Sequence, residues 1–302
     1  LHLSIRRQRQ MCIRDSFRSR NISSSIKDCT KWGIKNKISD GIALKKKLVI
    51  ITGAGRGIGK GVSETLAGCG YTCVLIARNP KEIENVEKKI KKSNGVAFYA
   101  TCDITDYSSV QKTIKEIISK HGNIYGLVNC AASPPAVGPS DDLDLKEWDK
   151  VIQTDLTGTF ITCQIVGKNM IKSKIGRIIN ISSFHSIATY PERVSYASAK
   201  NGVIGLTKAL AVEWGKDNIT VNAISPGPIK TPRTNWLLKQ DPENEALMIS
   251  RTPVGRMGNT EDVSNAIEFL MSEKSSFITG QNIIVDGGWL SSAWFGKYKP
   301  KK

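Results

Sequence analysis

The chain has 302 residues, of which 40% are hydrophobic and 24% charged, and its formal net charge is +17. That length is enough for one α/β domain with a buried core, and no apolar run reaches the roughly 20 residues that cross a bilayer. The excess charge lies at the ends: residues 48–296 carry 27 basic and 24 acidic residues without a basic stripe, which argues against nucleic-acid binding by the body.

Cysteine and histidine usage argues against two further classes. The seven cysteines are scattered without a Cys-x-x-Cys pair, and the three histidines are His2, His121 and His185. Such spacing offers neither a disulfide framework nor a zinc site. We therefore expect a soluble, cytoplasmic protein that holds no metal and does not bind membranes.

Residues 1–41 are rich in Arg and Ser and lack the periodicity of a packed element. A transit peptide has this composition. The stretch Arg9–Ser16 also resembles a translated sequencing adapter, and we favour that interpretation. We expect a disordered extension over residues 1–41, one domain over 42–291 and a basic tail over 292–302.

From Lys47 onward, short β-branched runs alternate with longer amphipathic ones, which is the pattern of βαβ units and a parallel sheet. The runs predicted as strands are Leu48–Thr52, Thr72–Ala77, Val96–Thr101, Ile124–Asn129, Arg177–Ser182, Thr220–Ser225 and Asn282–Val285. Apolar residues recurring every three or four positions predict one long helix from Trp148 to Val166 and another from Tyr196 to Trp214. The expected fold class is α/β: a Rossmann-type, doubly wound, seven-stranded parallel sheet with helices on both faces, in a single domain.

A glycine-rich segment follows the first predicted strand and opens a helix. It runs from Thr52 to Gly59 as Thr-Gly-Ala-Gly-Arg-Gly-Ile-Gly. Backbone N–H groups at such a helix N-terminus can face a pyrophosphate, and side chains would block its approach. A tight turn without a ligand is the alternative interpretation. The strand before and the helix after favour dinucleotide binding, by Gly53, Arg56, Gly57, Ile58 and Gly59.

The end of the second strand indicates which dinucleotide binds. An NAD-type site has a carboxylate there for the ribose 2′-hydroxyl, but this chain has Ala77 followed by Arg78. Either Arg78 or Arg56 alone could be a solvated surface residue. Because guanidinium groups match phosphate oxygens, the two together predict a 2′-phosphate site. We therefore expect NADP(H) as the preferred cofactor, with NAD(H) as the alternative.

A third cluster is spaced Ser-x12-Tyr-x3-Lys and consists of Ser183, Tyr196 and Lys200. Tyr196 and Lys200 fall one turn apart on the predicted helix. A tyrosine hydroxyl has a reference pKa of about 10, and a nearby ammonium stabilises the phenolate that a general base requires. A serine hydroxyl can hydrogen-bond a substrate oxygen as charge develops on it. A Tyr-x3-Lys pair alone is common on surface helices, but beside a cofactor loop it marks a candidate active site.

Together these motifs resemble the short-chain dehydrogenase/reductase family, and its 3-oxoacyl-carrier-protein reductases in particular, from Lys46 to Leu290. Further segments match in order, namely Cys102–Ile104, Val128–Ala131, Ser225–Thr231 and Thr279–Gly288. The resemblance implies hydride transfer between a nicotinamide cofactor and a carbonyl or alcohol carbon of a small molecule. It also implies a homotetramer or homodimer, because family members commonly associate through their long helices.

The resemblance places cofactor contacts on matching positions. Asp103 and Ile104 are expected at the adenine. Asn129 and Ala131 are expected along the ribose. The nicotinamide should be held by Pro226, Gly227, Ile229 and Thr231. Lys200 should also bind the nicotinamide ribose. Tyr196 should be the general acid in reduction and the base in oxidation, with the reacting carbon held near Ser183.

Two departures from the family pattern stand out. Asn129–Ala132 reads Asn-Cys-Ala-Ala where the family usually has Asn-Asn-Ala-Gly. Asp155 stands where the family has an asparagine that supports a water linked to the lysine. An amide donates and accepts, whereas an ionised carboxylate only accepts. We count Asp155 with the candidate catalytic residues and expect it to modify the proton relay without abolishing catalysis.

Other functions stay open at this point. A dinucleotide-binding scaffold or sensor with weak catalysis is compatible with Asp155, and a polyanion binder using the basic ends would show salt-dependent binding. The substrate is equally open between a 3-oxoacyl thioester, a sugar or polyol, and a hydrophobic ketone. It depends on residues 184–193, where His185 and Tyr190 are candidates for substrate contact, and on residues 233–251, where Trp236–Leu238 predict an apolar lid.

Deletion of residues 1–41 should leave the melting temperature and turnover nearly unchanged, because that segment has no periodic apolar face to bury against the domain. Thermal unfolding and steady-state assays of the shortened and full-length chains test this. A loss of several degrees would show that the segment contains a packed element.

Overall fold

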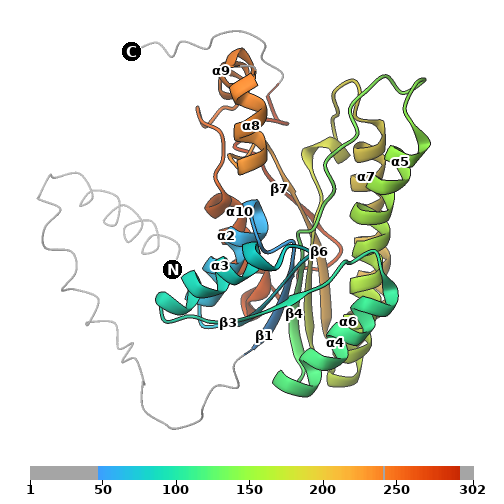
Figure 1. Ribbon diagram of the computed structural model, residues 1–302, viewed down its shortest axis with the longest axis vertical. Helices are drawn as coiled ribbons and strands as arrows, with labels where there is room; N and C mark the ends of the chain where they lie inside the picture. Colours follow the sequence, from blue (N-terminus) through green and yellow to red (C-terminus); the bar gives the residue numbers. More distant parts are fainter. Residues whose placement is uncertain (1–46, 241, 293–302) are drawn as a thin grey trace, which may run out of the picture. The chain divides into compact units, whose positions relative to one another are not determined.

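The computed structural model describes residues 47–240 and 242–292 (Figure 1). The expectations for residues 1–41 and for the basic tail after Ser292 lie outside the described residues. Within the described ranges no helix is long and apolar enough to cross a bilayer.

Seven strands form one parallel sheet in the order β3-β2-β1-β4-β5-β6-β7. Their bounds are β1 Leu48–Thr52, β2 Thr72–Ala77, β3 Val96–Thr101, β4 Ile124–Asn129, β5 Gly176–Ile181, β6 Ile219–Pro226 and β7 Asn282–Val285. The predicted fold class is confirmed, and only β5 and β6 differ from their predicted bounds, by one residue at each end. The strand order reverses between β1 and β4, and α/β sheets bind ligands beyond the carboxyl ends of strands at such a point.

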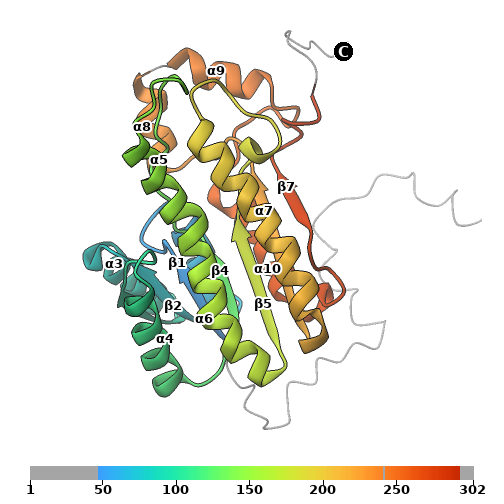
Figure 2. The ribbon, with the colours of Figure 1, turned by 90° about the vertical axis from the view of Figure 1, so that its right-hand side faces the viewer.

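Helices cover both faces of the sheet, as Figures 1 and 2 show. One face carries α2 (Gly57–Gly68), α3 (Pro80–Lys92) and α10 (Thr260–Met271). The other carries α4 (Tyr107–His121), α5 (Leu145–Ile152), α6 (Gly158–Ser173) and α7 (Val194–Trp214). Two shorter helices, α8 (Pro232–Gln240) and α9 (Pro242–Ser250), lie beyond the carboxyl ends of the strands.

Each face of the sheet buries its own apolar cluster. β1 reads LVIIT and is buried at every position. Val49 and Ile51 pack with the α2, α3 and α10 side, whereas Leu48 and Ile50 pack with the α4, α6 and α7 side. Side chains alternate between faces along a strand, so a strand covered on both faces must be apolar throughout. This is why the predicted strands read as continuous runs rather than as an alternating pattern.

The long helix predicted from Trp148 to Val166 contains an irregularity. A π-helical turn, Gln153–Thr157, joins α5 to α6. Such turns are rare, and single ones inside α-helices are frequent at functional sites. The turn contains Asp155, whose side chain is completely buried. The second predicted helix is confirmed as α7, which begins two residues earlier, at Val194.

A buried arginine closes the amino-terminal side of β5. Arg177 is fully buried and donates from Nη1 to the carbonyl oxygens of Gly176 (2.8 Å) and Asn218 (3.3 Å). Its Nη2 lies 3.3 Å from Oε2 of Glu273, which is 61% exposed. The carbonyl bonds, rather than the exposed ion pair, therefore make the larger contribution to stability.

Arg177→Met should lower the free energy of unfolding by about 2–4 kcal/mol, because the carbonyl groups of Gly176 and Asn218 lose their bonds to the buried guanidinium, although Asn218 still accepts from the Gly176 N–H. Glu273→Gln should lower it by less than about 1 kcal/mol, as is typical of an exposed ion pair. Urea unfolding of both variants measures the difference. Equal losses would mean that the ion pair, not the carbonyl bonding, is the stabilising contact.

Candidate active site

The glycine-rich loop brings two strand ends into backbone contact. Gly53 has a φ of +64°, and a Cβ on it would lie 2.7 Å from the backbone of Ala131, just after β4. A Cβ on Gly59, in the first turn of α2, would lie 2.3 Å from the Gly53 carbonyl oxygen. Both positions therefore require glycine. The loop is therefore in close contact with the segment after β4, and it leads directly into α2, whose first residues line the space beyond the strands.

That space is a cleft of about 1130 Å³. The sequence-predicted site residues that line it are Gly53, Arg56, Gly57, Ile58, Gly59, Arg78, Asp103, Ile104, Ala131, Ser183, Tyr196, Lys200, Pro226, Gly227, Ile229 and Thr231. Two predicted residues, Asn129 and Asp155, are absent from its lining. The residues brought together come from the ends of all the inner strands, as a doubly wound sheet arranges them.

The end of the cleft beside β2 carries an exposed arginine. Arg78 Nη1 lies 3.8 Å from Oδ2 of Asp103, a loose contact between side chains that are 69% and 41% exposed. Burial alone would raise the pKa of Asp103, but hydrogen bonds from the Thr105 N–H and hydroxyl, with the charge of Arg78, hold that pKa below its ordinary value. The Arg78 guanidinium thus keeps most of its donors available to a ligand.

Asn129 faces the interior instead of the cleft. Its amide donates to Oδ1 of Asn180 at 2.9 Å and accepts from the Thr162 hydroxyl at 2.8 Å. These bonds link β4, β5 and α6, and they use both ends of the amide. Any contribution of the Asn129 side chain to ligand binding is therefore indirect, through the position of the β4 end.

The predicted catalytic residues meet at the ends of β5 and α7. Ser183 lies two residues after the end of β5 at Ile181, and its Oγ accepts from the His185 N–H at 3.2 Å. Lys200 is buried, and its Nζ donates to the Ile181 carbonyl oxygen at 3.0 Å. The same ammonium lies 5.5 Å from the ring centroid of Tyr196, one turn earlier on α7. The lysine charge is thereby fixed beside the tyrosine.

Asp155 lies directly behind Lys200. Its Oδ2 is 3.2 Å from the Lys200 Nζ, and its Oδ1 accepts from the Ser133 N–H at 2.6 Å. Both charged side chains are almost completely buried, at 0% and 3% exposure. Oδ2 forms no hydrogen bond in the described part of the chain, so the ion pair is its only polar contact there. The carboxylate therefore contacts the lysine directly, rather than through the water that the family resemblance implied.

The ion pair keeps Lys200 charged. Burial lowers the pKa of the Lys200 ammonium, but the charge of Asp155, with a smaller effect of Tyr196, raises it above its ordinary value of 10.5. A group with a raised folded-state pKa stabilises the fold below its unfolded pKa and loses that effect as the pH rises through the folded value. The pair therefore contributes fully at neutral pH.

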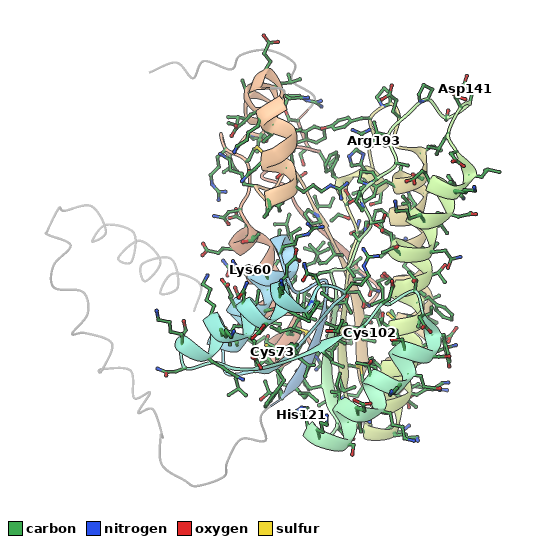
Figure 3. The ribbon with its side chains drawn as sticks, in the orientation of Figure 1. Lys60, Cys73, Cys102, His121, Asp141 and Arg193 are labelled. Carbon is green, nitrogen blue, oxygen red and sulfur yellow. The ribbon has the colours of Figure 1, made fainter. Side chains whose placement is uncertain are left out.

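Several residues that line the cleft belong to no family motif. His185 lies in the cleft wall, and burial, then the charge of Arg193, lowers its pKa to about 4, so it is neutral near pH 7. Arg193 and Arg233 line the cleft as well. Arg193 lies at the α8 end of the molecule, far from His121 at the other end (Figure 3). The only sequence signal for these residues is their position in loops and helix starts after strand ends.

Cysteine chemistry plays no part in this geometry. Burial raises the pKa of the Cys130 thiol to about 12 although Lys200 lowers it, so the thiol beside the lysine is neutral. The cysteines at 69, 73, 102, 130 and 163 are free thiols. In the ranges 47–240 and 242–292, no three His, Cys, Asp or Glu side chains are grouped to hold a metal ion.

Comparison with known proteins agrees with this arrangement. Residues 53–290 match the family model described as Enoyl-(Acyl carrier protein) reductase. The 3-oxoacyl-[acyl-carrier-protein] reductase FabG of Thermotoga maritima is 36% identical over 250 residues, which cover 81% of this chain and 98% of that protein. Trans-4-hydroxycyclohexanecarboxylate dehydrogenase of Sinomonas cyclohexanicum is 36% identical over 259 residues, covering 84% and 95%.

A solved structure gives the same result. A substituted actinorhodin polyketide ketoreductase with NADPH superposes with a TM-score of 0.77 at 28% identity, covering 81% of this chain and 97% of that one. Fold, cleft and matches together define a dinucleotide-dependent oxidoreductase. The chain belongs to the short-chain dehydrogenase/reductase family, whose enzymes oxidise alcohols or reduce carbonyl groups.

Asp155→Asn should lower the free energy of unfolding by about 1–3 kcal/mol, because the buried Lys200 ammonium loses its counter-charge. Alcohol oxidation should be equally fast or faster, because the amide oxygen of the variant can still accept from Lys200 and hold it in place, while the carboxylate no longer offsets the positive field of Lys200 at Tyr196. The half-maximal point of the pH–rate profile should therefore move to lower pH. Rate profiles with urea unfolding test both effects. Loss of activity in a folded Asp155→Asn protein would show that the carboxylate has a role of its own.

Proposed function

We propose that this protein is an NADP(H)-dependent oxidoreductase that transfers hydride between the nicotinamide and a carbonyl or secondary alcohol carbon, using Ser183, Tyr196 and Lys200. The observation that carries the proposal is the shared cleft. The glycine loop and all three of these side chains line it, and Lys200 is held charged beside Tyr196. One cavity thus combines a dinucleotide cradle with an acid–base group.

The glycine-rich loop fits a dinucleotide because no side chain covers its backbone where a phosphate must approach. A Cβ at Gly53 or Gly59 would collide with neighbouring backbone, and Gly57 has a φ of +54° at the start of α2. Helix N-termini with free N–H groups bind phosphates. We assign the pyrophosphate to Gly53 and Arg56 through Gly59. The adenine, ribose and nicotinamide contacts we assign to Asp103, Ile104, Ala131, Pro226, Gly227, Ile229 and Thr231.

The protein side of the reaction is acid–base chemistry. When bound, the nicotinamide supplies or accepts the hydride. In reduction the Tyr196 hydroxyl gives its proton to the substrate oxygen, while the Ser183 hydroxyl donates a hydrogen bond to that oxygen. The Lys200 ammonium stabilises the phenolate left behind. In oxidation the proton returns to Tyr196.

Asp155 acts through Lys200 rather than on the substrate. It lies outside the cleft lining and touches the lysine at 3.2 Å. By pairing with the charged ammonium it holds Lys200 in its orientation relative to Tyr196. We therefore assign it a positioning role.

The preference for NADP(H) rests on two guanidinium groups. Arg56 and Arg78 both line the cleft, and no acid occupies position 77. A 2′-phosphate can take bidentate hydrogen bonds from such groups, which a 2′-hydroxyl cannot match. The similar polyketide ketoreductase was solved with NADPH, which supports the same choice.

We infer a homo-oligomer as well, because apolar side chains on the outer helices face solvent in the single chain. Phe160 on α6 is 41% exposed and Val212 on α7 is 84% exposed. Such residues lose water contact when a second copy covers the helices. The free thiols support a reducing, cytoplasmic location, and we take residues 42–291 as the functional domain.

Arg78→Ala should weaken NADPH binding at least 10-fold and NADH binding by less than about 3-fold, because only NADPH carries the phosphate that the guanidinium binds. Fluorescence titration of both nucleotides gives the two dissociation constants. Lys60→Ala, at a half-buried position in the first turn of α2 and outside the cleft lining, serves as the control for loss of a nearby positive charge. Equal weakening of NADPH and NADH would rule out the 2′-phosphate assignment.

The reaction itself is tested by a substrate panel of a 3-oxoacyl thioester, a sugar, a polyol and a hydrophobic ketone, read by NADPH absorbance. We expect turnover of at least one member, and loss of at least about 10²-fold in Tyr196→Phe without loss of NADPH binding. Binding of NADPH without turnover of any member would indicate a dinucleotide-binding scaffold or sensor instead.

A further inference from the structure

The cleft has two electrostatically different ends. Its only carboxylates among the described lining residues are Glu82 and Asp103, and both belong to the end beside β2 that we assign to the adenosine. The other end is lined by Arg193, Arg233 and Lys200. The Lys200 charge is already balanced by Asp155. Two arginines therefore remain at the substrate end without a compensating acid.

Arg233 is held in place by backbone. It lies in the first turn of α8, and its Nη1 donates to the Ser133 carbonyl oxygen at 3.2 Å. The N–H of the same Ser133 donates to the Asp155 carboxylate. Burial lowers the pKa of Arg233. Tyr196 and Asp155 raise this pKa, whereas the positive charges of Arg56 and Arg193 lower it further. No carboxylate forms an ion pair with Arg233 in the described part of the chain.

Arg193 lines the same cleft, and its charge acts on Arg233. It directly precedes α7, three residues before Tyr196, and its Nη1 donates to the carbonyl oxygen of its neighbour Glu192 at 3.1 Å. Like Arg233 it forms no ion pair with an acid within the described ranges. A guanidinium has five donors in a planar fork. Each arginine uses one described bond to a carbonyl, so both retain donors for an anion.

Aromatic side chains that line the cleft pack beside Tyr196. The rings of Phe184 and His185 lie 4.2 Å apart, and His185 lies 5.0 Å from Tyr190 and 5.6 Å from Tyr196, both edge to face. His185 is neutral near pH 7, so it adds no further charge. This surface suits the apolar body of a small substrate.

Resting on the function proposed above, we propose that the substrate carries a carboxylate remote from its reacting carbon, and that Arg193 and Arg233 bind this carboxylate while these aromatic side chains cover the apolar body. Guanidinium groups recognise carboxylates through paired charge-assisted hydrogen bonds. The two arginines are thus specificity-determining residues, and a neutral analogue of the same shape is discriminated against because it leaves them unpaired.

The test uses matched pairs of ketones with NADPH at saturation: 4-oxocyclohexanecarboxylate and its methyl ester, and levulinate and its methyl ester. Wild-type protein should show the higher kcat/KM on the acid of at least one pair. Arg193→Gln and Arg233→Gln should each reduce kcat/KM for that acid about 10-fold, mainly through KM, and for its ester less than about 3-fold. Arg233→Lys should recover part of the loss.

Arg256→Gln is the matched control, because it removes an arginine that lies outside the cleft lining and pairs with Asp262 on the surface. It should leave the acid-to-ester ratio unchanged. Reduction of the esters as fast as the acids, or equal losses for acid and ester in both arginine variants, would overturn the carboxylate assignment while leaving the reductase function intact. Reduction of neither member of either pair, by protein that turns over a member of the earlier substrate panel, would overturn the carboxylate assignment alone. Absence of turnover with both sets of substrates would overturn the proposed function as well.

Discussion

The buried ion pair between Asp155 and Lys200 is the contact on which the site depends. Removing two charges from water costs several kcal/mol for each ion, and the pair offsets this only when its geometry is fixed on every side. Here it is fixed by two backbone bonds, from Ser133 to the carboxylate and from Lys200 to the Ile181 carbonyl. The pair therefore joins the π-helical turn, the segment after β4, the end of β5 and α7.

That junction explains the position of the chemical groups. Ile181 is the last residue of β5, so the bond from Lys200 sets the distance between α7 and the strand that leads to Ser183. Ser133 connects the same pair to Arg233 at the start of α8. The acid–base group, the serine and the proposed carboxylate-binding arginine are consequently positioned by one network. The glycine loop is positioned separately, by its close contact with Ala131.

Much of this could be predicted from the sequence because local patterns determine it. Buried strands in a two-sided parallel sheet must be apolar throughout, and the strand bounds followed from that alone. The glycine loop and the Ser183, Tyr196 and Lys200 spacing were recognisable because each motif lies within one strand–loop–helix unit. The spacing placed Tyr196 and Lys200 on one helix face, and the structure has the lysine beside the tyrosine ring.

What the sequence did not predict depends on contacts between distant segments. The π-helical turn has the same apolar periodicity as a regular helix, so the pattern could not distinguish them. Asn129 was expected along the cofactor, but its amide is satisfied by Asn180 and Thr162, far away in the chain. Likewise Arg233 becomes a candidate only because tertiary folding brings α8 to Ser133. The side chains of Trp236 and Leu237 in the expected apolar lid lie outside what the structure describes, whereas Leu238 is buried.

The dependence of the site on this ion pair can be measured with a double-mutant cycle of Asp155→Asn, Lys200→Met and the double variant, each followed by urea unfolding. Lys200→Met leaves the Asp155 carboxylate buried without its partner, so it should be the most destabilising single change. The double variant removes both charges, and its loss should be smaller than the sum of the single losses by about 1–3 kcal/mol. Losses that add to within about 0.5 kcal/mol would mean that the two charges are not coupled, and would contradict the central role given to the pair.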